Sequence, residues 1–241
     1  MIQNTKQFYG SILSALDGDF GHAKDFYFDD KSWVIRYLVA DTGSWLTGRL
    51  VLLSPHAFGK WDHYEKALHI KLRKKQIENS PSIETHEPVS RQFEENYYRS
   101  YGWPPYWQGG QMWGMGGYPR VAAPLPQDPA TRKASEPRSD RHLQSTKAMA
   151  GYSVEASDGM VGHIGGFLVD DRNWAISDML VEAGHWFSGK EVLISPRAVE
   201  KISPAESKVY INLTMADIQA TAGNTLAVAG AGDHPKAIFS D

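Results

Sequence analysis

The sequence repeats itself once. Residues 17–80 and 158–221 align without a gap at a constant offset of 141 residues, and 22 of the 64 aligned pairs are identical. Residues kept in both copies are expected to be mainly those that the fold requires. Residues that differ between the copies are therefore the first place to look for function.

The identical residues gather in four short motifs. In the first copy these are Asp17-Gly18-x-x-Gly21-His22, Asp29-Asp30-x-x-Trp33, Gly43-x-Trp45-x-x-Gly48 and Val51-Leu52-x-Ser54-Pro55, and the second copy holds them in the same order. A unit of about 70 residues has a marginal core, so pairing of the two copies would add stability. Two copies are too few for a solenoid or a propeller.

Each copy has the pattern of several short strands separated by turn residues. In the second copy we predict strands over 152–156, 160–169, 174–181, 191–194 and 209–213, then a helical turn over 214–218 capped by Thr214. Glycines interrupt the second of these strands, and such glycines mark bulges or bends that curl a sheet. The predicted fold class is all-β, with two small, highly curved barrels and short helical turns.

A segment of different composition joins the copies. Its first half, residues 93–118, is called here the aromatic strap, and it holds nine aromatic residues among 26. Its second half, residues 119–147, is polar and rich in proline and serine, as expected of a flexible linker. The predicted divisions are 1–82 for the first repeat, 83–150 for an irregular linker, 151–222 for the second repeat and 223–241 for a loose tail.

Composition limits the classes of function. The chain has 241 residues, no cysteine and a net charge of −3. Disulfides, thiolate metal sites and a cysteine nucleophile are excluded, and an acidic balance disfavours nucleic acid as the leading partner. No apolar run approaches the roughly 18 residues of a membrane span, and no secretory pattern opens the chain, so we expect a cytoplasmic protein.

Taken in order, the four motifs resemble the PRC-barrel domain. This family is named for the cytoplasmic part of the H subunit of photosynthetic reaction centres, and it also forms the C-terminal part of a bacterial ribosome-maturation factor. The resemblance covers about residues 11–80 and 151–221. The chain is also similar to stand-alone tandem members of the family, in which a Tyr-Tyr…Tyr-Trp linker joins the two copies.

The resemblance implies that each copy is a small, highly curved barrel that docks onto other proteins, and we interpret the two copies as an internal pseudo-dimer. It implies no enzymatic activity and no cofactor. The N-terminal membrane helix of the H subunit has no counterpart here, and ten residues stand where the ribosome factor has a domain of its own. Neither named function therefore transfers residue by residue.

The repeated histidines, His22 and His163, each follow a glycine and lie near an aspartate in sequence. Histidine supplies acid–base chemistry near neutral pH, but recurrence in both copies favours a structural hydrogen bond. No nucleophile motif and no phosphate-binding loop accompanies them. No catalytic residues are predicted.

Two groups of residues raise the question of a metal site. The pairs Asp29-Asp30 and Asp170-Asp171 offer oxygen ligands for a hard cation, although a hairpin turn explains them more simply. His56, His63 and His69 are unique to the first copy, but their spacing does not gather them on one helix or strand. No metal is predicted.

Two features occur in one place only, and they supply the candidate partner-binding residues. The first is a basic segment made of Lys66, Lys71, Arg73, Lys74 and Lys75, where the second copy has only Lys208. The second is the aromatic strap, with Tyr97, Tyr98, Tyr101, Trp103, Tyr106, Trp107 and Trp113. The cations are either a solvated strand end or a contact for an acidic protein, RNA or anionic lipid. The rings either pack over the barrels or form a recognition surface.

We expect a noncatalytic adaptor that binds other proteins, with pairing of the two copies inside the chain and further self-association as an open question. One alternative is RNA processing or ribosome assembly. Another is peripheral contact with a membrane-bound partner, as in the H subunit. All of these rest on fold, which does not fix function by itself.

Overall fold

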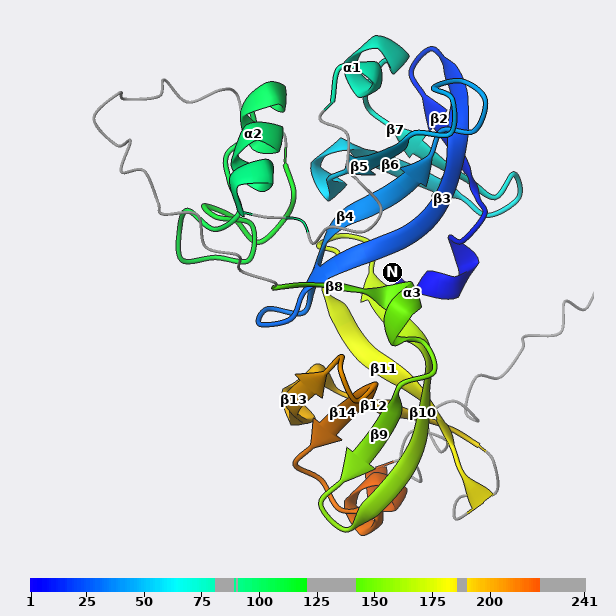
Figure 1. Cartoon of the computed structure of the whole chain (residues 1–241), viewed down its shortest axis with the longest axis vertical. Helices are drawn as coiled ribbons and strands as arrows, with labels where there is room; N and C mark the ends of the chain where they lie inside the picture. Colours follow the sequence, from blue (N-terminus) through cyan, green and yellow to red (C-terminus); the bar gives the residue numbers. More distant parts are fainter. Residues whose placement is uncertain (81–88, 90, 121–141, 186–189, 222–241) are drawn as a thin grey trace, which may run out of the picture. The chain divides into compact units, whose positions relative to one another are not determined.

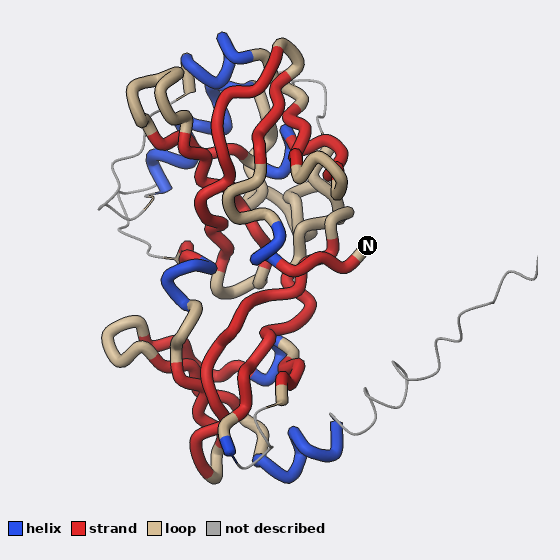
Figure 2. The backbone as a smooth tube through the Cα atoms, turned by 90° about the vertical axis from the view of Figure 1, so that its right-hand side faces the viewer, coloured by secondary structure: helices blue, strands red, loops and turns tan. Residues whose placement is uncertain are grey.

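The structure is a computed structural model that describes residues 1–80, 89, 91–120, 142–185 and 190–221. Strands are the main secondary structure of the described residues (Figure 2), and they form two seven-stranded sheets. The prediction of a mostly β protein is confirmed. The predicted tail and most of the polar linker lie outside the described residues.

The two sheets have the same strand order. The first contains β2 (Ile12–Ala15), β3 (Gly18–Asp29), β4 (Val34–Asp41), β5 (Leu50–Leu53), β6 (Phe58–Asp62) and β7 (Ala67–Ile70), in the order β5-β4-β3-β2-β7-β6 (Figure 1). The second contains β9 (Ser153–Ala156), β10 (Gly159–Asp170), β11 (Ile176–Ala183), β12 (Glu191–Ile194), β13 (Val199–Ser203) and β14 (Lys208–Ile211), in the order β12-β11-β10-β9-β14-β13. The parallel pairs β2–β7 and β9–β14 repeat at the offset of 141. β6 and β13 were not predicted from the sequence.

Neither sheet closes into a barrel. Within the described residues, β5 is not hydrogen-bonded to β6, nor β12 to β13, so both hydrogen-bonded paths are open. A short 3-10 helix separates each of these strand pairs, η2 (Pro55–Ala57) in the first copy and η5 (Pro196–Ala198) in the second. The proline that begins each helix has no N–H to donate to a strand ladder. The predicted closed barrels are wrong for this reason.

The repeat extends further toward the N-terminus than the motifs indicate. β1 (Ile2–Asn4) pairs with β10, and β8 (Leu143–Ser145) pairs with β3. Each of these strands precedes its own copy but joins the long strand of the other. Short helices follow both, η1 (Thr5–Gln7) and α3 (Thr146–Met149). Residues 143–149, which the sequence analysis placed in the linker, therefore correspond to residues 2–8.

The chain divides into two compact units that are not the two repeats. Unit 1 comprises Met1–Ala150 and Gly166–Ser177, and unit 2 comprises Gly151–Gly165 and Asp178–Asp241. β10 passes from unit 2 into unit 1 between Gly165 and Gly166, and β11 returns to unit 2 after Ser177. Unit 1 thus contains the first repeat together with the tip of a hairpin from the second.

The hairpin tip completes the core of unit 1. Trp174 is 4% exposed, and its ring packs against Phe8, Phe26 and Phe58 at centroid distances of 5.7, 5.9 and 4.7 Å. Phe8 and Phe26 are completely buried. Because large aromatic side chains dominate core energetics, Trp174 is a principal contributor to this core.

The Asp-Asp-x-x-Trp motif is a turn, as predicted. The Asp29 carboxylate accepts hydrogen bonds from the backbone N–H groups of Lys31 and Ser32, and the N–H of Trp33 donates to the Asp29 carbonyl at 2.8 Å. Trp33 has a φ of 54°, and Trp174, which was predicted to begin a strand, has a φ of 60°. This left-handed backbone is costly for a tryptophan, and burial of the ring offsets it.

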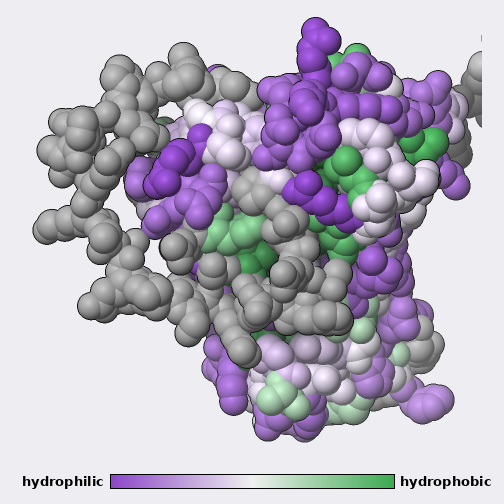
Figure 3. All heavy atoms as spheres, turned by 45° about the horizontal axis from the view of Figure 1, so that its top comes forward, coloured by the Kyte–Doolittle hydropathy of each residue, from purple (hydrophilic) through white to green (hydrophobic). Residues whose placement is uncertain are grey.

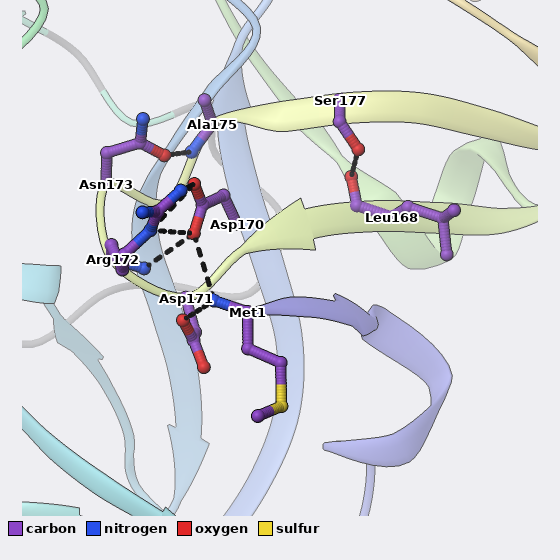
Figure 4. A network of polar contacts seen from close by, with 8 residues as sticks. All are labelled: Met1, Leu168, Asp170, Asp171, Arg172, Asn173, Ala175 and Ser177. Carbon is purple, nitrogen blue, oxygen red and sulfur yellow. Dashed lines mark hydrogen bonds and ion pairs between the residues drawn. The ribbon is translucent and has the colours of Figure 1, made fainter.

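The corresponding turn of the second copy lies in unit 1 (Figure 4). The Asp170 carboxylate accepts hydrogen bonds from the backbone N–H and from the guanidinium of Arg172. The Met1 amine contacts Asp170 and Asp171, at 3.4 and 2.6 Å. These aspartates are occupied by turn and terminal contacts.

The Asp-Gly-x-x-Gly-His motif has two structural roles. The Asp17 carboxylate accepts the backbone N–H of Lys74 at 2.8 Å, where α1 (Lys74–Glu78) begins. A Cβ on Gly21 would lie 2.1 Å from the carbonyl oxygen of Asp41, so only glycine lets β3 approach β4 this closely. The second copy repeats both features with Asp158 and Gly162.

Unit 2 has a smaller core and one helix at its end. Its core side chains include Val154, Val161, Val181 and Val209, all completely buried. Residues 215–221 are helical, and Thr214 and Asp217 exchange hydrogen bonds in a capping arrangement. The predicted helical turn capped by Thr214 is confirmed.

Candidate binding pocket

The two features found in one place only, the basic segment and the aromatic strap, meet at a pocket in unit 1. Its volume is about 370 Å³. Its less polar lining comes from His56, Ala57, Leu72, Tyr101 and Trp103. Its polar lining comes from Lys71, Gln76, Asn79 and Ser100. Figure 3 shows hydrophilic side chains gathered at the α1 end of this unit.

One wall of the pocket comes from a helix, α2 (Arg91–Tyr101) (Figure 1). The expectation of an irregular linker is wrong here. Phe93, Tyr97, Tyr98 and Tyr101 are spaced by four, one and three residues, which places them on one face of a helix. Tyr97 and Tyr98 are completely buried, and the Tyr97 hydroxyl accepts the backbone N–H of Ser54. The spacing predicts a helix, whereas the prolines and glycines of residues 102–117 that follow it are typical of irregular structure.

Most of the candidate aromatic residues pack inside unit 1. Tyr97, Tyr98, Trp103, Tyr106 and Trp113 are buried, whereas Tyr101 and Trp107 are half-buried. Trp103 stacks on Tyr101, with centroids 4.5 Å apart and an interplanar angle of 13°, and on His56 at 5.3 Å and 20°. The packing interpretation of the strap holds for these rings. Of the predicted residues only Tyr101 and Trp103 line the pocket.

A buried polar cluster fixes the strap behind the pocket. Glu94 on α2 is completely buried, and its Oε1 accepts the hydroxyls of Tyr37 at 3.0 Å and Tyr106 at 2.8 Å. Its Oε2 lies 3.0 Å from a guanidinium nitrogen of Arg91 and 3.1 Å from Nε2 of His142. Burial raises the pKa of Tyr37 and of Tyr106 well above the usual range, and the Glu94 charge adds to the effect.

A buried cation lies beside this cluster. Arg36 is 3% exposed, and its guanidinium lies 3.8 Å from the ring centroid of Tyr106 and 4.9 Å from that of Trp113. It donates hydrogen bonds to the carbonyl of Met112 and the hydroxyl of Ser32. Burial lowers the pKa of Arg36, so aromatic faces and neutral oxygens stabilise this charge in place of water.

His56 forms part of the pocket floor in a neutral state. It is 2% exposed, and its Nδ1 lies 2.9 Å from the Ser54 hydroxyl. Burial, followed by the positive charge of Arg36, lowers the pKa of His56 to about 4. The second copy has Arg197 at this position. Ser54 is completely buried, so the Ser54–His56 pair is a packing contact and not an accessible nucleophile.

The basic segment is split by the structure. Lys66 precedes β7 and Lys71 follows it, so the two are separated by roughly 16 Å of extended chain. Lys74 lies 5.7 Å from the ring centroid of Trp45, and Lys75 pairs with Glu78 at 2.9 Å. Arg73 is exposed and precedes α1. Lys71 is the member of the segment that lines the pocket.

The positive charge of a further arginine, Arg49, acts on the pocket lining. Arg49 donates hydrogen bonds to the backbone carbonyls of Glu78, at 2.9 Å, and Ser80. The pKa of Tyr101 is raised to about 12 by burial, and a hydrogen bond to Ser80 and the charge of Arg49 oppose the rise. The field of Arg49 therefore reaches the aromatic wall.

The remaining candidates are not brought together. His56 is buried, whereas His63 and His69 are exposed, and no cluster of three metal-binding side chains occurs among the described residues. His22 and His163 are exposed on β3 and β10, and neither makes a side-chain hydrogen bond to another described residue. The predicted structural hydrogen bond of these histidines is absent from the described part of the chain.

Comparison with known proteins gives no match. The chain fits no family model and is not significantly similar to any curated protein. Among the residues that the structure describes, no helix has the length and apolar character needed to span a membrane. The function must therefore be argued from the geometry of the pocket.

Proposed function

We propose that this chain is a noncatalytic assembly adaptor built from two PRC-type modules, and that unit 1 holds a segment of a partner protein in the pocket. The resemblance of the four motifs to the PRC-barrel domain, and the presence of two copies, support the adaptor role. The pocket supplies the site of recognition.

The observation that carries the proposal is the origin of the pocket walls. They come from the strap, which occurs once, and from six first-copy positions, of which only Ala57 and Leu72 are identical in the second copy. Lys71 corresponds to Asn212, Gln76 to Asp217 and Asn79 to Ala220. A site assembled from the residues that differ is expected where function, and not the fold, has determined the sequence.

The chemistry of the walls suits binding. A volume of about 370 Å³ lies near the lower end of ligand pockets, and tyrosine and tryptophan are the preferred anchors of protein interfaces. Polynucleotide is less well supported, because Lys75 is paired with Glu78 and Lys66 lies at the far end of β7. A net charge of −3 adds no general attraction for a polyanion.

Filling the pocket tests the proposal. Ser100 is exposed on α2 and lines the pocket, so Ser100→Trp places a large ring in the opening without touching the core. Arg99→Trp puts the same ring at the adjacent exposed position, outside the lining residues, and serves as the matched control. Each protein is crosslinked in its native cell, and the captured partners are identified by mass.

We expect a partner that wild type and Arg99→Trp both capture to be lost with Ser100→Trp. A partner set that is unchanged by filling the pocket would refute the assignment. Recovery of the wild-type chain only with ribosomes or only with washed membranes, equally for both variants, would favour the ribosome-assembly or membrane alternative instead.

A further inference from the structure

We propose that the pocket recognises an acidic protein segment, with a carboxylate at Lys71 and an adjacent large apolar side chain against Tyr101 and Trp103. This inference rests on the proposed function and specifies the chemistry of the partner. Three independent properties of the pocket support it: its uncompensated charge, its hydrogen-bond donors and its aromatic wall.

The positive charge at the pocket is not cancelled. None of the described residues that line it is acidic. Lys71 is exposed and forms no ion pair within the described chain, whereas Glu78, an acidic residue on α1, is engaged by Lys75. A cation of this kind attracts a carboxylate, and the attraction between the two charges becomes stronger where the filled pocket excludes water.

Two buried or half-buried arginines strengthen this field. Arg49 is held by the carbonyl oxygens of Glu78 and Ser80, and Arg36 by a carbonyl, a hydroxyl and two aromatic rings. These direct partners are all uncharged, and the Asp29 carboxylate acts on Arg36 only through its charge, without a hydrogen bond or ion pair to it. The charge of Arg36 helps to lower the pKa of His56, and the charge of Arg49 opposes the rise in the pKa of Tyr101. Both charges therefore act on residues that line the pocket.

The polar rim supplies donors to match the two oxygens of a carboxylate. The side-chain oxygen of Gln76 already accepts the backbone N–H of Arg73 at 3.0 Å, which leaves its amide N–H groups for a ligand. Asn79 contributes a second amide to the lining. The Ser100 hydroxyl donates to the carbonyl of Tyr97, so its oxygen remains an acceptor for a peptide N–H.

The remaining wall requires an apolar group. Tyr101, Trp103 and Leu72 provide aromatic and aliphatic surface, and His56 beneath them is neutral above a pH of about 4. A volume of about 370 Å³ accommodates one large side chain beside a carboxylate rather than a helix. An acidic residue next to a phenylalanine or leucine meets both requirements.

The test uses two peptides that differ only in charge. Acetyl-Gly-Phe-Glu-Gly-amide and acetyl-Gly-Phe-Gln-Gly-amide are titrated into the isotope-labelled full chain, and NMR shifts of the Trp103 indole N–H are followed. We expect the acidic peptide to bind at least tenfold more tightly, because a charged hydrogen bond contributes about 1.5–3 kcal/mol. Added salt should reduce this difference.

Two lysine variants locate the effect. Lys71→Gln should weaken binding of the acidic peptide about tenfold, whereas Lys75→Gln, in the same basic segment but outside the pocket lining, should change it less than twofold. Equal affinity for both peptides, or equal effects of the two variants, would overturn the inference. So would tighter binding of an oligouridylate than of the acidic peptide, measured by the same shifts of the Trp103 indole N–H.

The two proposals fail differently. If neither peptide binds but Ser100→Trp still abolishes partner capture, the pocket is a docking site and only the acidic ligand class is wrong. If partner capture survives Ser100→Trp, the proposed function itself is wrong.

Discussion

Lowering the pH should destabilise unit 1 through His56. The pKa of this side chain falls from 6.5 to about 4 on folding, because the ring is buried and lies near Arg36. Between these two values the unfolded chain binds a proton that the folded chain does not. The contribution is therefore complete above pH 6.5 and is lost progressively as the pH falls toward 4.

The size of the effect follows from the two pKa values. A tenfold change in proton affinity corresponds to about 1.4 kcal/mol, so the full difference is worth about 3 kcal/mol. At pH 5 roughly 2 kcal/mol of this has already been lost. That is a large fraction of the stability of a small domain.

Urea unfolding at pH 7.5, 6 and 5, followed by NMR signals of β4, would measure the free energy of unfolding of unit 1 separately from that of unit 2. His56→Gln keeps an acceptor for the Ser54 hydroxyl but cannot be protonated in this range. We expect this variant to be less stable at pH 7.5, since it loses the stacking on Trp103, but to show a smaller loss between pH 7.5 and 5. Parallel stability curves for wild type and variant would refute the reasoning.

Two other substitutions test the structure against matched controls. Glu94→Gln removes a completely buried carboxylate and should destabilise unit 1 by about 3 kcal/mol. The control, Glu78→Gln, changes an exposed ion pair and should cost less than about 1 kcal/mol. Similar urea midpoints for the two variants would contradict the buried network. Gly21→Ala forces a Cβ to within 2.1 Å of the Asp41 carbonyl oxygen and should cost about 2 kcal/mol or more, measured by amide exchange in β3 and β4. Gly110→Ala, where a Cβ meets open space, should be nearly neutral in the same measurement.

Local patterns in the sequence predicted much of the fold. Alternation and turn residues placed most strands, and the Asp29-Asp30 turn and the Thr214 cap were assigned correctly. The pairing of β1 with β10 and of β8 with β3 was not predicted, because the partner strands lie more than a hundred residues away and leave no local pattern. A signal did exist: Gln3, Thr5 and Gly10 are repeated at the same offset of 141 as Gln144, Thr146 and Gly151.

The candidate site was predicted in parts but not as a whole. Lys71, Tyr101 and Trp103 were each selected because they do not repeat, but nothing in the sequence indicated that they line one pocket. Glu94 and His142 were missed, since polar residues in a linker are normally exposed and no pattern marks the few that are buried. Burial of these two depends on α2 packing against β4, a contact between distant parts of the chain.

The sharing of a hairpin between the repeats also sets an order for folding during synthesis. Trp174 emerges 116 residues after Phe58, the ring against which it packs most closely. At 5–20 residues per second this interval is roughly 6–23 s, longer than the milliseconds to seconds in which small β domains fold. The first repeat therefore has an incomplete aromatic core during this interval. The nascent chain is most prone to misassembly before the last residues of unit 1 have been synthesised.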